Sequence, residues 1–157
     1  MKLSHQESEK SIMEIIQVDT QEQLEQCLSI RRTVFVGEQN VSIEEEMDSY
    51  DVSPSSCYHW LIRVDGQPVA TGRWREYEPG TAKLQRIAVL SEYRGKAYGL
   101  RIVQAMEQDA KRRGYSRAVL DAQCTAEAFY QRLGYKNVST EPFLDAGIWH
   151  VRMEHIL

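Results

Sequence analysis

Cysteine is scarce in this sequence, and long apolar runs are absent from it. The 157 residues include three cysteines, Cys27, Cys57 and Cys124, and this odd, widely spaced set fits reduced thiols better than a disulfide framework. No cysteine–histidine group has the spacing of zinc ligands, so we expect no metal. No apolar run approaches the ~20 residues of a membrane-spanning helix. The N-terminal stretch MKLSHQESEKS lacks the apolar region of a signal peptide, and a cytoplasmic location with no membrane partner is predicted.

An excess of basic residues is also absent. The net charge is −4, which argues against bulk attraction to nucleic acid or to an anionic membrane. Apolar residues make up 42% of the chain and charged residues 27%, a balance typical of a globular protein rather than a disordered one. We expect a loose tail over residues 1–12 and one domain over residues 13–157.

Two familiar phosphate-binding loops, G-x-x-x-x-G-K-[ST] and G-x-G-x-x-G, are missing as well. The segment 83–113 nevertheless has a form that suits an anion. A short apolar strand over 84–90 leads into a basic turn, and a helical pattern begins at Gly99 and ends before Gly114. Backbone N–H groups in the first turn of a helix lack partners and favour phosphate. The alternative is an ordinary strand-to-helix connection with a solvated basic loop.

The remaining chain predicts an alternation of strands and helices. A helix capped by Asp19 or Thr20 should run to about Val36, where Gly37 is expected to break it. Asp65–Gly66 predicts a tight hairpin turn. A strand after the second helix should lie parallel to the strand at 84–90. The other predicted elements are strands at 13–18, 59–64, 69–75 and 117–122, a helix at 125–133, and a terminal hairpin of 135–139 with 148–156.

The segment 43–51 is strongly acidic, with the sequence IEEEMDSYD. Our preferred interpretation is a solvated surface loop. The alternative is a wall that attracts a cationic amine.

Two motifs carry a resemblance to a known family. The segment Arg94–Gly99, RGKAYG, resembles the pyrophosphate loop [RQ]-x-x-G-x-[GA] of the GNAT N-acetyltransferases, with Ala97 at the central glycine. The block Gln123–Tyr135 resembles the family pattern N-x-x-A-x-x-F-Y-x-x-x-G-[FY], with Gln123 in place of the asparagine. The segment Arg31–Gln39 also resembles the end of the first helix in small bacterial members. The motifs come in the right order on suitable elements, and the resemblance spans nearly the whole chain.

The resemblance implies an α/β (α+β) fold whose mixed sheet of about seven strands is splayed at its centre and flanked by about four helices. Acetyl-coenzyme A would lie in the splay as co-substrate, with its pantetheine arm along Ile87–Val89 and its diphosphate on the basic loop. The acceptor would be a small-molecule or peptide amine, and a homodimer is left open. The implied coenzyme-binding residues are Ile87, Ala88, Val89, Arg94, Gly95, Lys96, Ala97, Tyr98, Gly99, Gln123, Ala126 and Phe129.

Amine acetylation needs a neutral amine, donors for a tetrahedral oxyanion, and a proton for the departing thiolate. The resemblance implies that Tyr130 supplies that proton. The alternative is that its phenol only forms a structural hydrogen bond. The general base stays open among water and the side chains of Glu38, Glu46, Asp48, His59 and His150.

Two further hypotheses concern a covalent catalytic step and a function without catalysis. Cys124 lies beside the second motif, but no histidine is near it in the sequence to activate a covalent step. A non-catalytic acyl-coenzyme A-binding module is the rival function, because Ala97 would narrow the loop if its backbone required positive φ.

Overall fold

The computed structural model describes residues 11–157. The tail predicted over residues 1–12 therefore lies almost entirely outside the described residues. The strands are β1 (Met13–Gln17), β2 (Tyr58–Val64), β3 (Gln67–Glu78), β4 (Thr81–Val89), β5 (Arg117–Gln123), β6 (Lys136–Asn137), β7 (Phe143–Asp145) and β8 (Ile148–Ile156). The α-helices are α2 (Gln21–Arg31), α3 (Ile43–Glu46), α4 (Tyr98–Arg112) and α5 (Glu127–Arg132). A π-helix, η1 (Arg32–Glu38), follows α2, and short 3₁₀ turns are η2 (Ser49–Asp51), η3 (Ser91–Tyr93) and η4 (Cys124–Ala126).

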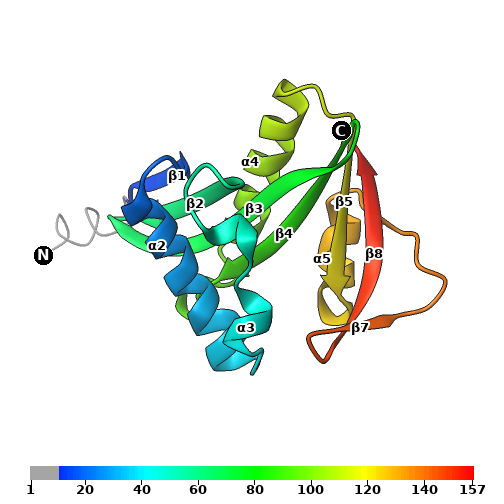
Figure 1. The fold of residues 1–157 in the computed structure, drawn as a ribbon, viewed down its shortest axis with the longest axis horizontal. Coiled ribbons are helices and arrows are strands. Elements are labelled where there is room, and N and C mark those ends of the chain that lie inside the picture. The colour runs from blue at the N-terminus through cyan, green and yellow to red at the C-terminus, as the bar shows by residue number, and fades with distance from the viewer. Residues whose placement is uncertain (1–10) are drawn as a thin grey trace, which may run out of the picture.

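The strands form one mixed sheet of eight strands in the order β1-β2-β3-β4-β5-β8-β6, with β7 paired to β8 (Figure 1). β4 and β5 are parallel and the other pairs are antiparallel. The predicted mixed sheet with four helices is confirmed. The eighth strand is β7, which turns back on β8 through the left-handed residues Ala146 and Gly147.

The centre of the sheet is splayed, as predicted. β4 pairs with β5 only from Thr81 to Leu84, opposite Arg117 to Leu120, and the strands then diverge (Figure 1). A bulge in β4 shifts its register against β3, and Arg86 takes a left-handed φ of 56° there. Bulges bend a strand and re-aim its backbone groups. The backbone of β4 beyond Leu84 is therefore left unpaired on the side of β5.

Helices cover the two faces of the sheet unequally. α4 packs Ile102, Val103 and Met106 on one face, against the buried residues of β3 and β4. α2 packs Leu24 and Leu28 on the opposite face of β2–β4. α5 covers β5 and β8 on the same side of the sheet as α4. On their other side, which faces the viewer in Figure 1, no helix of the described chain covers these two strands. The α2 face of the sheet is therefore open beside the splay.

The first helix begins as predicted and ends differently. Thr20 and Gln23 form a capping box that satisfies the first backbone donors of α2. The predicted break at Gly37 is wrong, because the helical winding widens after Arg31 into η1 and runs through Gly37 to Glu38. Wide backbone bonds, such as Gln39 N–H to the Val34 oxygen at 3.2 Å, close this segment. π-helical turns of this kind are frequent at functional sites.

The acidic segment is only partly the solvated loop that we predicted. Glu44 and Glu45 are exposed, but Glu46 and Asp51 are 3% and 7% exposed. Both buried carboxylates form ion pairs with arginines, because α3 and η2 fold the segment back over the sheet. Sequence composition alone did not reveal these partners.

Candidate active site

A cavity of about 590 Å³ opens where β4 and β5 part. On the α4 side it is bounded by the end of β4, the basic loop, the start of α4 and α5. On the α2 side it is bounded by η1, α3 and the polar side chains of β4, β5 and β8. Of the predicted coenzyme-binding residues, Ile87, Ala88, Val89, Arg94, Gly95, Ala97, Tyr98, Gly99, Gln123, Ala126 and Phe129 line this cavity. Lys96 does not, because its ammonium lies over the Tyr93 ring, 5.9 Å from the centroid.

The basic loop places two left-handed residues just before α4. Gly95 and Ala97 have φ values of 77° and 67°, and Ala97 is the residue before the helix. The Arg94 guanidinium donates to the Val89 carbonyl at 2.9 Å and to the Glu38 carboxylate at 2.8 Å. Arg94 is therefore held at the cavity by a backbone oxygen and by the Glu38 carboxylate.

Replacing Ala97 by glycine is expected to stabilise the fold by about 1 kcal/mol, because a left-handed φ is costly for alanine and not for glycine. The matched change Gly95→Ala should destabilise by a similar amount, since an added Cβ there meets no atom within 4 Å and only the backbone conformation is strained. Thermal unfolding of both variants measures these changes in stability. Coenzyme affinity of Ala97→Gly should be equal or better. A lower melting temperature for Ala97→Gly would contradict the assigned loop conformation.

Tyr130 lies on α5 with its ring between two other aromatic rings. It is 8% exposed, and Phe129 and Tyr135 contact it edge-on with centroids 5.0 and 5.9 Å away. Burial, with no hydrogen bond or charge opposing it, raises the pKa of the phenol well above its usual range. Tyr130 also lines the cavity, so a protonated hydroxyl borders the space between the splayed strands.

Comparison with known proteins decides the family. Residues 15–157 match the family model described as an acetyltransferase (GNAT) domain. The chain belongs to the GNAT acetyltransferase family. The uncharacterised Bacillus subtilis protein YyaT is 41% identical over 141 residues, covering 90% of this chain and 94% of YyaT. The uncharacterised B. subtilis N-acetyltransferase YjcF is 39% identical over 141 residues, covering 90% of this chain and 98% of YjcF.

Solved structures agree with this assignment. An acyl-CoA N-acyltransferase from Pseudomonas aeruginosa superposes with a TM-score of 0.79 at 27% identity, over 93% of this chain and 99% of that one. Escherichia coli ElaA gives the same TM-score at 24% identity, over 92% and 99%. The family model and the sequence relatives identify the protein as an N-acetyltransferase of the GNAT type, and a GNAT domain implies the use of an acyl-coenzyme A.

The structure separates the base candidates of this GNAT acetyltransferase. Glu38, Asp48 and His59 do not line the cavity, and Glu46 and His150 do. Burial lowers the pKa of His59, whose ring bonds the Tyr50 carbonyl at 2.8 Å on the α2 side of the sheet.

Glu46 and His150 present different chemistry to the cavity. Glu46 is engaged by Arg31 at 2.6 Å and by Arg86 at 2.9 Å. His150 is 9% exposed, and its Nδ1 lies 2.7 Å from the Ile148 carbonyl. Since only a protonated nitrogen can bond a carbonyl, the neutral ring carries its lone pair on Nε2. His150 is thus the cavity candidate with an uncommitted basic atom.

Cys124 is half-buried in η4 and does not line the cavity. No described histidine bonds its sulfur, so a covalent catalytic step through Cys124 gains no support.

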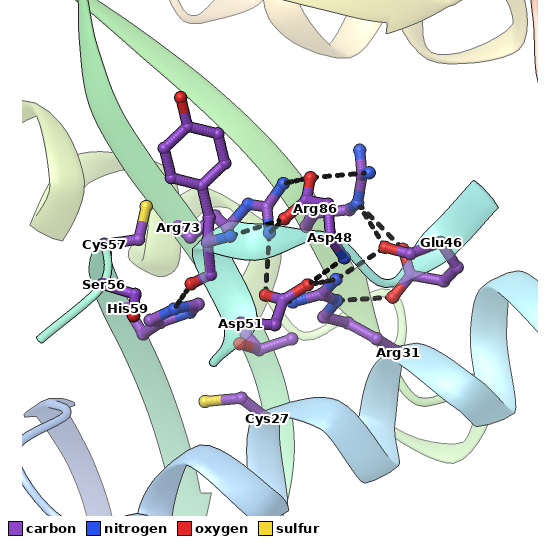
Figure 2. A network of polar contacts seen from close by, with 12 residues as sticks. Cys27, Arg31, Glu46, Asp48, Asp51, Ser56, Cys57, His59, Arg73 and Arg86 are labelled. Atoms are coloured by element: carbon purple, nitrogen blue, oxygen red, sulfur yellow. Dashed lines mark hydrogen bonds and ion pairs between the residues drawn. The ribbon is translucent and has the colours of Figure 1, made fainter. Parts of the chain in front are cut away.

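A buried ion-pair network anchors the acidic segment beside the cavity (Figure 2). Arg31 bonds the carboxylates of Glu46 and Asp51, each at 2.6 Å. Arg73 bonds Asp51 at 2.7 Å and Asp48 at 2.6 Å. Burial opposes the charge on Asp51, but hydrogen bonds and the positive charges of Arg31 and Arg73 outweigh it and hold its pKa well below the usual range. The network links α2, β3 and the acidic segment as one polar unit.

Arg86 extends the network to the cavity. Its side chain pairs with Glu46 at 2.9 Å and with Asp48 at 3.6 Å. Arg86 is also the left-handed residue of the β4 bulge. The network therefore fastens the bulge to the acidic segment, and it positions the β4 backbone that lines the cavity.

A second feature that sequence reasoning missed is a pair of bonded amides that both line the cavity. The amides of Gln39 and Gln123 bond each other, with Gln123 donating at 2.8 Å and Gln39 at 3.4 Å. They join the residue after η1 to the end of β5. The resemblance had marked Gln123 only as a coenzyme-binding residue, and 84 residues separate it from its partner.

Residues 11–157 contain no group of three or more His, Cys, Asp or Glu side chains placed to hold a metal ion. Among the same residues, no helix is long and apolar enough to cross a bilayer. The cytoplasmic location and the homodimer stay sequence-based predictions.

Proposed function

We propose that the protein transfers an acetyl group from acetyl-coenzyme A to a primary amine by direct attack in a ternary complex. The observation that supports this most is the cavity through the splayed sheet, bordered by the basic loop and Tyr130 on one side and by His150 on the other. Donor and acceptor can thus enter from opposite faces of the sheet. The assay that tests this is thiol release from acetyl-coenzyme A in the presence of amines.

The unpaired edge of β4 is the proposed seat of the pantetheine arm. Ile87, Ala88 and Val89 lie beyond the last β4–β5 pair, so their backbone groups on that side have no strand partner. An extended amide-containing arm can pair with such an edge as an added strand does. PaiA of Thermoplasma acidophilum, a neighbour with 17% identity, was solved with coenzyme A.

Arg94→Glu is expected to weaken coenzyme A binding at least tenfold, because a charge-assisted contact with the diphosphate becomes a repulsion. Lys96→Glu is the matched control from the same loop and should have a smaller effect, since Lys96 does not line the cavity. Calorimetric titration of coenzyme A into both variants measures the difference. Equal losses in the two variants would contradict the assigned role of Arg94.

The bulge of β4 is the proposed source of oxyanion donors. An N–H group among Ile87–Val89 would face the thioester carbonyl, where a preorganised donor stabilises the tetrahedral intermediate. The Tyr130 hydroxyl would then protonate the departing thiolate, and its raised pKa keeps that proton on the phenol through the neutral range.

His150 is the proposed general base, acting directly or through a water. A lysine-like amine with a pKa of ~10 is protonated at neutral pH and must lose a proton before attack. The Nε2 atom of His150 is the uncommitted basic atom on the acceptor side of the cavity.

His150→Asn is expected to lower kcat/KM by about a hundredfold near neutral pH, because asparagine keeps a donor for the Ile148 carbonyl and removes the basic nitrogen. Thiol release measured from neutral to alkaline pH should show the loss shrinking as the amine deprotonates on its own. A loss that does not change with pH would contradict a base role, and an unchanged rate would assign the proton to water.

Ala97 does not support the alternative function, a non-catalytic module that binds acyl-coenzyme A. The loop takes the left-handed conformation with alanine in place, so the residue costs stability without removing the loop geometry.

A further inference from the structure

Three cations surround one exposed tyrosine on the open face of the sheet. The centroid of the Tyr77 ring lies 5.9 Å from the charge of Arg75, 5.4 Å from that of Lys83 and 5.2 Å from that of Arg152. Tyr77 is 42% exposed, and it is the extra residue of a bulge in β3. We call these four residues the Tyr77 cluster. The exposed Tyr77 ring and its hydroxyl therefore lie close to three positive charges.

The Tyr77 cluster has more positive than negative charge. Among residues 11–157 its one carboxylate partner is Asp121, which bonds Arg152 with both oxygens and lies 3.4 Å from the Lys83 ammonium. The other carboxylates of this region are engaged elsewhere. Glu78 and Glu154 both pair with Arg117 at 2.8 Å, and Glu76 accepts the Tyr115 hydroxyl at 3.0 Å.

Two of the cations also repel each other. Arg75 and Lys83 are directly opposite in the β3–β4 ladder, a position in which like charges are destabilising. The Arg75 Nε atom is buried and has no hydrogen-bond partner among the described residues. An anion between the Arg75 and Lys83 side chains would relieve the repulsion between them.

The Tyr77 cluster is continuous with the active-site cavity. Lys83 and Asp121 line the cavity at the point where β4 and β5 part. Lys83, Asp121, Arg152 and His150 share the open sheet face, because they alternate with the core residues of their strands. Arg86, at the bulge, lies three residue-to-residue steps along β4 from Lys83, a distance of roughly 10 Å. A molecule with its amine at the bulge can therefore reach the Tyr77 cluster with its other end.

We propose that the Tyr77 cluster is an oxyanion subsite for the acceptor, so that the acceptor is a primary amine that also carries a carboxylate or a phosphate. This inference rests on the proposed acetyl transfer. Guanidinium and ammonium groups around a hydroxyl are the donors that bind carboxylate and phosphate oxygens. The diphosphate of the coenzyme belongs to the other end of β4, since the six residue-to-residue steps from Lys83 to Val89 span roughly 20 Å.

Matched amine pairs test the subsite. Each anionic amine is compared with a neutral partner of similar length: γ-aminobutyrate with butylamine, ε-aminohexanoate with hexylamine, and 4-aminobutyl phosphate with 4-aminobutanol. We expect kcat/KM to favour the anionic member at least tenfold in one or more pairs. A preference in the carboxylate arm or in the phosphate arm identifies the oxyanion, and parity in every pair would overturn the proposal.

Variants separate the subsite from general effects on the enzyme. Arg75→Gln and Lys83→Gln should each reduce the anionic-to-neutral ratio of kcat/KM at least fivefold, and Lys83→Arg should restore most of it. Arg117→Gln is the control on the same face, because Arg117 already pairs with two carboxylates and is not one of the cations that lie over the Tyr77 ring. A ratio that falls as much in Arg117→Gln as in Arg75→Gln would overturn the proposal.

A binding measurement distinguishes failure of the subsite from failure of the proposed function. Inorganic phosphate is titrated by calorimetry into protein saturated with coenzyme A, so that the basic loop is already occupied. If phosphate binding weakens at least fivefold in Arg75→Gln, the subsite is supported. If no amine is acetylated in addition, that second result counts against the proposed acetyl transfer and not against the subsite. Binding that is absent, or unchanged in Arg75→Gln, would overturn the subsite even if neutral amines are acetylated.

Discussion

The Tyr130→Phe variant is expected to turn over about a hundredfold more slowly than the unmodified enzyme, with coenzyme affinity and stability nearly unchanged. Phenylalanine keeps the ring that packs against Phe129 and Tyr135 and removes only the hydroxyl proton that we propose goes to the leaving thiolate. Since burial raises the pKa of Tyr130, the unmodified enzyme should not lose activity through its ionisation between neutral pH and about pH 10. Steady-state thiol release and coenzyme titration on one preparation measure both quantities.

Tyr135→Phe is the matched control for that experiment. The Tyr135 hydroxyl donates to Glu107 at 2.8 Å and does not line the cavity. Its loss should cost about 1.5 to 3 kcal/mol of stability, the range for hydrogen bonds to charged groups, and leave turnover intact. If Tyr130→Phe instead loses stability and keeps its turnover, the phenol is structural and water delivers the proton.

Replacing Arg31 by methionine is expected to destabilise the protein by about 3 kcal/mol. Arg31 is 1% exposed and bonds two buried carboxylates, so its removal leaves Glu46 and Asp51 each with one fewer buried partner. The estimate takes the low end of the range for a broken buried pair, because Arg86 and Arg73 still contact these carboxylates. Denaturant unfolding at neutral pH measures the change.

The pH dependence of the same variant gives a second check on the network. A carboxylate whose folded pKa is depressed contributes stability above its unfolded pKa and loses that contribution as the pH falls below it. The unmodified protein should therefore lose stability as the pH falls below 3.8, the ordinary pKa of aspartate, and Arg31→Met should lose less over that window. Glu22→Gln is the control, since Glu22 is 81% exposed in its pair with Arg63 and should change stability by less than about 1 kcal/mol. A similar small effect in Arg31→Met would show that the buried network contributes little.

Local signals in the sequence predicted much of the fold. The Thr20 cap, the Asp65–Gly66 turn and the strand–loop–helix segment after Lys83 each depend on neighbouring residues, and all three are confirmed. The parallel pairing of β4 with β5 followed from the intervening helix. The break at Gly37 was wrong because glycine is compatible with the wider π-helical turn that the chain adopts there.

Features built from distant residues could not be predicted in this way. Arg31, Arg73 and Arg86 meet the acidic segment across separations of 15 to 40 residues, and no local pattern encodes which carboxylate they choose. Lys96 was included with the basic loop because of its charge, but its direction depends on the Tyr93 ring. His150 stood out among the base candidates only when the register of β8 placed it opposite Gln123 at the cavity.

The most direct test of the account is thiol release from acetyl-coenzyme A by the unmodified protein across a panel of primary amines, with mass spectrometry of each product. We predict amine-dependent thiol release together with a product heavier by one acetyl group, and release near the uncatalysed background when no amine is present. Tight binding of acetyl-coenzyme A with no amine-dependent release from any member of the panel would contradict the proposed transfer.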